Sequence, residues 1–144
     1  MKVNLQTSLL LPVFGMVLLT ISIALWMLKL RYKAVLKDGI NAKYFKLNRG
    51  AKLPDYLVQV AQHYENLFET PVLFYLAIVL VLVFHLNDFS YVFFAWAYFI
   101  SRLIHAYIHT INNRLKYRKY AFILTSIILI LLWFRLFLDI IVIS

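Results

Sequence analysis

Cysteine is absent from this chain of 144 residues, and glycine and proline occur only three times each. Without a thiol the protein can form no disulfide, supply no thiolate nucleophile of its own and bind no zinc or iron–sulfur cluster through cysteine. The scarcity of small residues gives no indication of close GxxxG-type helix crossings. Acidic residues are also few, six against fifteen lysines and arginines, whereas 64% of the residues are hydrophobic. The composition is therefore strongly apolar and basic.

Long apolar runs predict an integral membrane protein. Soluble domains are roughly half apolar, and about 20 apolar residues in a helix cross the hydrocarbon core of a bilayer. The first run is longer than a signal-peptide core and lacks a small-residue cleavage site, which favours a retained span. We predict an all-α bundle of four transmembrane helices, one domain over residues 1–144, with helices at about 7–33, 55–85, 91–112 and 119–142.

Basic residues concentrate in two of the three predicted loops, and the second loop has none. The positive-inside rule therefore places loops one and three in the cytoplasm and both termini on the opposite side. Topology and anionic lipid account for this charge, so we expect no nucleic-acid partner. The residues concerned are Lys29, Arg31, Lys33, Lys37, Lys43, Lys46, Arg49 and Lys52 in or beside loop one, and Arg114, Lys116, Arg118 and Lys119 in loop three.

Two polar stripes lie within the predicted spans. The first precedes the second apolar run, and its spacing puts all six residues on one helix face. A carboxylate at membrane depth normally faces protein or a water-filled cavity and marks function. Counting about 1.5 Å per residue from a turn at 87–90 puts Glu69 level with His105 and Asn66 level with His109. The stripes comprise Gln59, Gln62, His63, Asn66, Glu69 and Thr70, and Tyr98, Arg102, His105, His109 and Asn112.

The converging groups predict a polar pocket that opens to the cytoplasm. Glu69 can accept an ammonium group, Gln62 and Asn66 can hydrogen-bond amides, and four cations can bind carboxylates. This set suits a small zwitterionic peptide with several carboxylates, while an apolar second substrate arrives from the bilayer. The structural alternative is that Arg102 simply neutralises Glu69 and the pair serves packing specificity. The four cations are Arg102, Arg114, Arg118 and Lys119.

Histidines give little support to a metal centre. The chain has only four, and His85 belongs to the side of the membrane opposite His105 and His109. A membrane di-iron enzyme needs more ligands than remain. We therefore predict no metal site. Haem bound between His63 and one histidine of the third span is the alternative that a four-helix bundle leaves open.

Four segments resemble the MAPEG family, the membrane-associated proteins in eicosanoid and glutathione metabolism. They are KLRYKA at 29–34, NLFETP at 66–71, RLIHAYIH at 102–109 and RLKYRK at 114–119, so the resemblance covers nearly the whole chain. It implies a homotrimer with glutathione bound between neighbouring subunits at the cytoplasmic side. It also implies that Arg118 is catalytic and holds the glutathione thiol as a thiolate. The expected glutathione-binding residues are Lys29, Arg31, Gln62, Glu65, Asn66, Glu69, Arg102, His105, His109, Arg114 and Lys119.

We therefore expect a membrane-bound transferase or peroxidase that uses glutathione, or a related thiol, against a lipophilic electrophile or hydroperoxide. Its expected partners are the bilayer, two further copies of itself and a lipophilic small molecule. A non-catalytic lipid-binding or scaffold protein on the same fold is the alternative. The presence of Arg118 favours the enzyme. Gln62 and Glu65 favour the scaffold, because they stand where the family commonly carries arginines.

Overall fold

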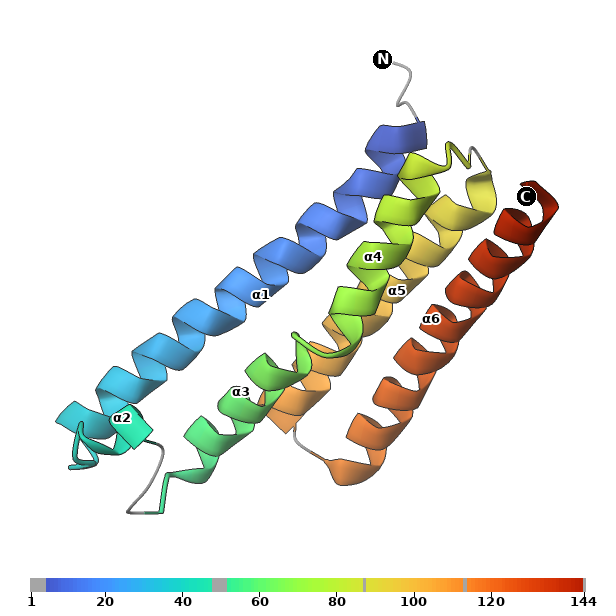
Figure 1. The fold of residues 1–144 in the computed structure, drawn as a ribbon. Coiled ribbons are helices and arrows are strands. Elements are labelled where there is room, and N and C mark those ends of the chain that lie inside the picture. Colours follow the sequence, from blue (N-terminus) through green and yellow to red (C-terminus); the bar gives the residue numbers. More distant parts are fainter. Residues whose placement is uncertain (1–4, 48–51, 87, 113, 144) are drawn as a thin grey trace.

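The structure is a computed structural model that describes residues 5–47, 52–86, 88–112 and 114–143, and these ranges contain helices but no strand. Figure 1 shows the helices side by side, with α5 in contact with both α1 and α6. In chain order they are α1 (Leu5–Leu36), α2 (Tyr44–Leu47), α3 (Asp55–Asn66), α4 (Thr70–Val83), α5 (Phe89–Tyr107), the π-helix η1 (Ile108–Asn112) and α6 (Leu115–Ile143).

Four helical segments are long and apolar enough to cross a membrane, as the sequence predicted. The second is made of α3 and α4 together, and the third continues from α5 into η1. The protein is accordingly an integral, multi-pass membrane protein. The segments are Leu5–Leu36, Asp55–Val83, Phe89–Ile111 and Leu115–Val142.

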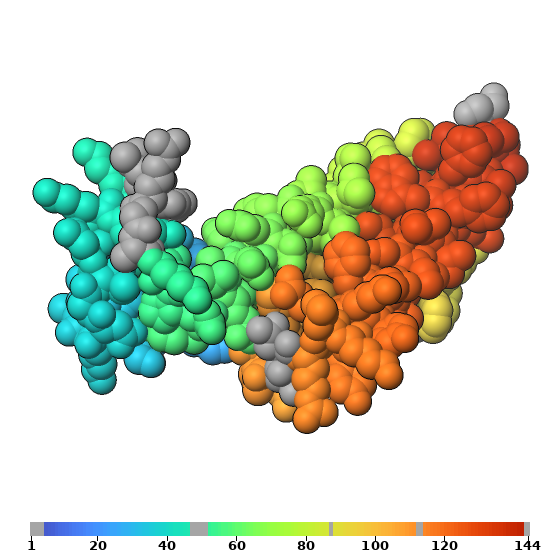
Figure 2. All heavy atoms as spheres, turned by 90° about the horizontal axis from the view of Figure 1, so that it is seen from below, coloured from blue at the N-terminus to red at the C-terminus, as the bar shows by residue number. Residues whose placement is uncertain are grey.

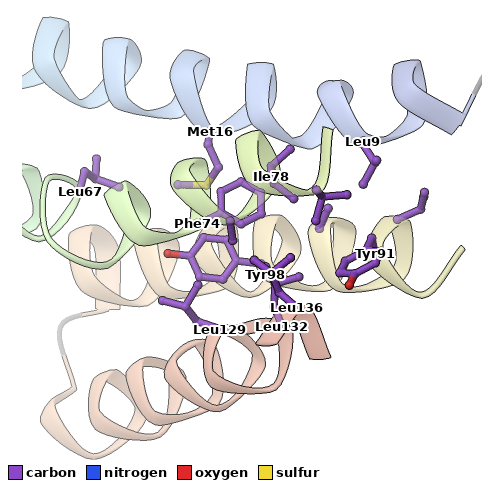
Figure 3. Packing of buried hydrophobic residues seen from close by; sticks show 14 of the residues in the cluster. Leu9, Met16, Leu67, Phe74, Ile78, Tyr91, Tyr98, Leu129, Leu132 and Leu136 are labelled. Carbon is purple, nitrogen blue, oxygen red and sulfur yellow. The ribbon is translucent and has the colours of Figure 1, made fainter. Parts of the chain in front are cut away.

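The core of the bundle lies between α1, α4, α5 and α6. Phe74 of α4 stacks on Tyr98 of α5 with ring centroids 4.4 Å apart, and Met16 and Leu129 lie around this pair (Figure 3). Gly15 permits a close approach of α1 to α5, because a Cβ atom there would lie 2.5 Å from the ring of Phe99. No pattern in the sequence indicated this glycine-dependent contact.

A polar network ties the start of α5 to the end of α6. Asp88 caps α5 by accepting a hydrogen bond of 2.7 Å from the Ser90 backbone N–H, which lowers the pKa of Asp88 below its ordinary value. Arg135 lies 3.2 Å from Asp88 and 3.1 Å from Asp139. Tyr91 donates a hydrogen bond of 2.6 Å to Asp139. Arg135 and Asp139 thus form an i,i+4 ion pair within α6.

The chain reverses direction after α4 earlier than predicted. His85 has a φ of 52°, its N–H donates to the Leu82 carbonyl, and the Leu86 N–H donates to the Val81 carbonyl over 3.0 Å. This hydrogen-bond pattern is a Schellman motif, which ends a helix sharply. The predicted turn was centred later, and Asn87 within it lies outside the described residues. The contacts of Asn66 with Arg102 and of Thr70 with Tyr98 show that the predicted depth register of α5 was wrong by about two helical turns.

The second span is broken at residues 67–69, between α3 and α4. Pro71 has no N–H to donate to the Leu67 carbonyl, and its ring crowds that carbonyl, so a continuous helix is unfavourable. The end of α3 tightens into shorter-range hydrogen bonds, from the Leu67 N–H to the Tyr64 carbonyl and from the Phe68 N–H to the Glu65 carbonyl. The sequence predicted one unbroken helix here.

Arg102 satisfies the backbone that the break exposes. Its side chain is fully buried, and it donates over 3.1 Å to the Asn66 carbonyl at the end of α3 and over 3.4 Å to the Thr70 hydroxyl. The cation thus lies at the partly negative end of α3. Among the described residues no ion pair joins Arg102 to Glu69, whose side chain is exposed. The direct Glu69–Arg102 ion pair of the structural alternative is therefore not formed.

Replacing Arg102 by methionine should lower the free energy of unfolding by about 1–3 kcal/mol, because the buried Asn66 carbonyl loses its donor. The measurement is denaturant unfolding of the protein in detergent. Lys119→Met is the control, since that exposed cation should change stability by no more than about 0.5 kcal/mol. In a Pro71→Ala background the effect of Arg102→Met should shrink, because α3 and α4 can then share helical hydrogen bonds. Equal effects in both backgrounds would contradict this account.

Candidate functional site

Four of the predicted site residues meet at the break in the second span. Asn66 and Glu69 approach from the break, and Arg118 and Lys119 approach from the first turns of α6. Together with two apolar residues, Leu115 and Phe122, they line a groove of about 330 Å³. Figure 2 views the molecule from the end where the start of α3 and the start of α6 lie. We call this cavity the polar groove.

The charges in the polar groove have opposite signs. Glu69 and Lys119 are exposed, while Asn66 and Arg118 are partly buried. Because α6 begins at Leu115, earlier than predicted, Arg118 lies in its first turn, where the helix dipole adds positive potential. The groove can therefore bind an ammonium group at Glu69 and an anion at Arg118 and Lys119 at the same time.

Three other predicted residues line a different cavity. Arg31, Gln62 and Glu65 surround a space of about 250 Å³ between α1, α2 and α3, with Tyr44 and Phe45 closing it on the α2 side. Arg31 also lies over the ring of Phe45, 5.4 Å from its centroid. We call this space the α1–α3 cavity, and it is separate from the polar groove.

Lys29 of α1 and Arg114, just before α6, are exposed. Neither of them is among the residues that line the polar groove or the α1–α3 cavity. Within a single chain the structure therefore does not bring these two predicted cations to the other site residues.

The remaining predicted residues are buried inside the bundle. Arg102, His105 and His109 have at most 1% of their surface exposed, so they lie behind the cavities rather than on them. His63 of α3, also fully buried, packs against both histidines, with ring centroids 5.7 Å from His105 and 4.9 Å from His109. The side chain of Gln59 donates to the His109 carbonyl near the start of η1. The inward part of the polar stripe thus faces α5 and η1.

The grouping of the three histidines was missed by the sequence analysis. Each of the three rings contributes one nitrogen, and these three nitrogens all lie within 4.8 Å of one another. The prediction of no metal site rests on the number of ligands that a di-iron centre needs, whereas a single ion needs only three imidazoles. The i,i+4 spacing of His105 and His109, with His63 on the neighbouring helix, was the available signal. The misplaced register of α5 concealed it.

An apolar groove of about 470 Å³ runs along α5 and α6. Its walls include Phe93, Trp96 and Ile100 of α5 and Leu124 and Ile128 of α6. Phe93 and Ile100 expose half or more of their surface, which is expected of side chains that face lipid. A lipophilic molecule dissolved in the bilayer can reach this surface without crossing water.

Comparison with known proteins identifies the family. The MAPEG family model matches residues 9–138, which include the polar groove, the α1–α3 cavity and the three buried histidines. No match was found among curated proteins or among solved structures. Because the family match spans nearly the whole chain, this protein belongs to the MAPEG family.

Proposed function

We propose that this protein is a membrane-bound transferase or peroxidase that uses glutathione, or a related thiol, against lipophilic electrophiles or hydroperoxides. The polar groove carries the proposal, because it places Glu69 and Asn66 in one cavity with Arg118 and Lys119. Membership of the MAPEG family supports the same class of function.

Each residue of the groove has a distinct role in the proposal. Glu69 accepts the ammonium group of glutathione, Asn66 hydrogen-bonds a peptide amide, and Lys119 attracts a carboxylate. Arg118 lies beside the thiol, where its permanent positive charge favours the thiolate over the neutral form. A thiol of ordinary pKa, about 8.5, is then ionised at neutral pH and becomes the nucleophile.

The chemistry follows from that thiolate. In a transfer reaction its sulfur forms a bond to the electrophilic carbon, and the leaving group departs with its electron pair. In a peroxidase reaction two glutathione molecules reduce one hydroperoxide to an alcohol and water, and they leave as the disulfide. Neither reaction needs a nucleophile from the chain, which is consistent with the absence of cysteine.

Assembly into a homotrimer is part of the proposal. Arg31, Gln62 and Glu65 line a cavity separate from the polar groove, so one chain does not present the whole predicted set at one place. A closed ring of subunits repeats one heterologous contact, which can bring the α1–α3 surface of one subunit against the groove of the next. The exposed position of Glu69 supports such an arrangement.

Native mass measurement in detergent tests the assembly. We expect a trimer, and we expect glutathione affinity to fall when dilution dissociates it, because groups from neighbouring subunits complete the site. A monomer that binds glutathione as tightly as the trimer would contradict the shared site.

The polar groove is proposed to open to the cytoplasm, with both termini on the opposite side. Because the chain has no cysteine, a single introduced cysteine reports sidedness without background. Asn87→Cys in the second loop should react with an impermeant reagent only from the non-cytoplasmic side, and Lys37→Cys in the first loop only from the cytoplasmic side. The reversed pattern would invert the assignment and move the groove to the other face of the membrane.

Arg118→Ala and Glu69→Gln separate activation of the thiol from binding. Without the Arg118 cation, the thiolate fraction of bound glutathione should fall roughly tenfold, equivalent to one pKa unit, while most binding remains. Glu69→Gln should instead raise the glutathione Kd by roughly ten- to a hundredfold, because one charge-assisted hydrogen bond is lost. Ultraviolet absorbance of the thiolate and a glutathione titration measure the two effects.

Lys116→Ala is the matched control, since this exposed cation of α6 is not among the groove-lining residues. It should change neither measurement. The double change Gln62→Arg with Glu65→Arg should tighten glutathione binding if the missing arginines weaken it. A wild-type protein with no thiolate and no turnover, unimproved by that double change, would favour the lipid-binding scaffold instead.

A further inference from the structure

Three histidines form a buried cluster that the proposed thiol chemistry does not use. His63 comes from α3, His105 from α5 and His109 from η1, and their exposed fractions are 0%, 1% and 0%. One ring nitrogen from each lies within 4.8 Å of the other two. The chain contains four histidines in all, and the fourth, His85, is exposed beyond the end of α4. Three of the four thus meet at one point inside the bundle.

All six ring nitrogens of the cluster lack a hydrogen-bond partner among the described residues. Buried polar groups in proteins nearly always have one, so each exception requires an explanation. Among the other buried polar groups, the Ser90 hydroxyl and the Nε of Arg102 also lack a partner. Thr125 and Ser101 follow the rule, because Thr125 donates to Ser101 and Ser101 donates to the Tyr98 carbonyl. Each imidazole of the cluster therefore has a nitrogen lone pair that accepts no hydrogen bond from a described residue.

The donor set selects a class of ion. Three neutral imidazoles suit zinc, copper, iron or nickel, whereas magnesium and calcium prefer oxygen ligands, which the cluster does not contain. Three protein ligands with a fourth position open is the arrangement of catalytic zinc sites. We propose that His63, His105 and His109 bind one transition-metal ion of the imidazole-preferring class, such as Zn²⁺, within each chain.

The present geometry is close to that of a bound state. Zinc–nitrogen bonds of about 2.0–2.1 Å in a tetrahedron put ligand nitrogens about 3.3 Å apart. Nitrogens that already lie within 4.8 Å need shifts of about 1.5 Å or less, which rotation of the imidazole rings can supply. A π-helix carries His109, and such widened turns are frequent at functional sites. Gln59 holds that turn against α3 through the His109 carbonyl.

Haem, the alternative that the sequence left open, fits this cluster poorly. Two axial histidines must stand on opposite faces of a porphyrin, with the macrocycle between them. The three rings instead pack directly together, with centroids 4.9–5.7 Å apart, and none has an exposed edge. A single ion at the common point of the three rings needs no such slot.

Nearby cations affect which fourth ligand would complete the coordination of a bound ion. Arg102 precedes His105 by one turn of α5, and the ring of Phe122, which lines the polar groove beside Arg118, lies 6.0 Å from the His105 ring. Positive charge at these positions opposes a dication, so an anionic fourth ligand such as hydroxide is favoured over neutral water.

Metal binding by the whole protein tests this inference directly, in the absence of glutathione. The protein is purified with a tag that contains no histidine, stripped with a chelator and dialysed against Zn²⁺ or Co²⁺. We expect one bound ion per chain and the visible absorption of tetrahedral Co²⁺. His63→Ala, His105→Ala and His109→Ala should each weaken binding roughly tenfold or more, because each removes a ligand. His85→Ala is the matched control and should bind as the wild type does.

X-ray absorption of the zinc-loaded His85→Ala protein tests the proposal even if the variants at His63, His105 and His109 fail to fold. Only the three clustered histidines then remain in the chain, so scattering from three imidazoles identifies them without disrupting the site. Absence of stoichiometric binding by the wild type would overturn the proposal. So would a zinc ion coordinated by oxygen ligands alone, or binding that the three alanine variants leave unchanged.

Discussion

The missing backbone N–H of Pro71 is the constraint on which the polar features of this bundle depend. A membrane interior offers no water to a carbonyl that has lost its helical partner, so a break in a span requires a donor from the protein. Arg102 supplies that donor at Asn66. The break in turn sets Glu69 at the start of α4, with its side chain outside the bundle rather than within it. Fold stability and the shape of the polar groove therefore share one cause.

The polar stripe of α3 serves two sites because of its width. At about 100° per residue, the four polar residues of α3 from Gln59 to Asn66 cover an arc of about 100°. One edge of that arc, with His63, packs against α5 and η1, and the other edge, with Gln62, faces outward. Periodicity gathers these residues on one face of a helix, but only the neighbouring helices determine which edge is buried.

The four spans could be predicted because length and apolarity decide them, and the Arg135–Asp139 pair could be predicted because i,i+4 spacing within one helix fixes it. Contacts between helices were harder to predict from the sequence. The register between α4 and α5 depends on His85, whose backbone has a left-handed conformation. Residues other than glycine adopt this conformation uncommonly, and no local sequence pattern predicted it here. An error of about two helical turns at that point paired Asn66 with His109 instead of Arg102, and the contact of His63 with His105 and His109 was not predicted.

The groove and the histidine cluster are near neighbours, and this proximity gives the two proposals a physical connection. Phe122 lines the polar groove and its ring lies 6.0 Å from the ring of His105, so little more than one aromatic side chain separates the sites. Across such a medium of low polarity, charges interact more strongly than they would through water. An ion held by the three imidazoles would add to the field of Arg118 and Lys119, and so favour the ionised form of a thiol in the groove. Without that ion, the positive field at the thiol comes from Arg118 and Lys119 of the groove.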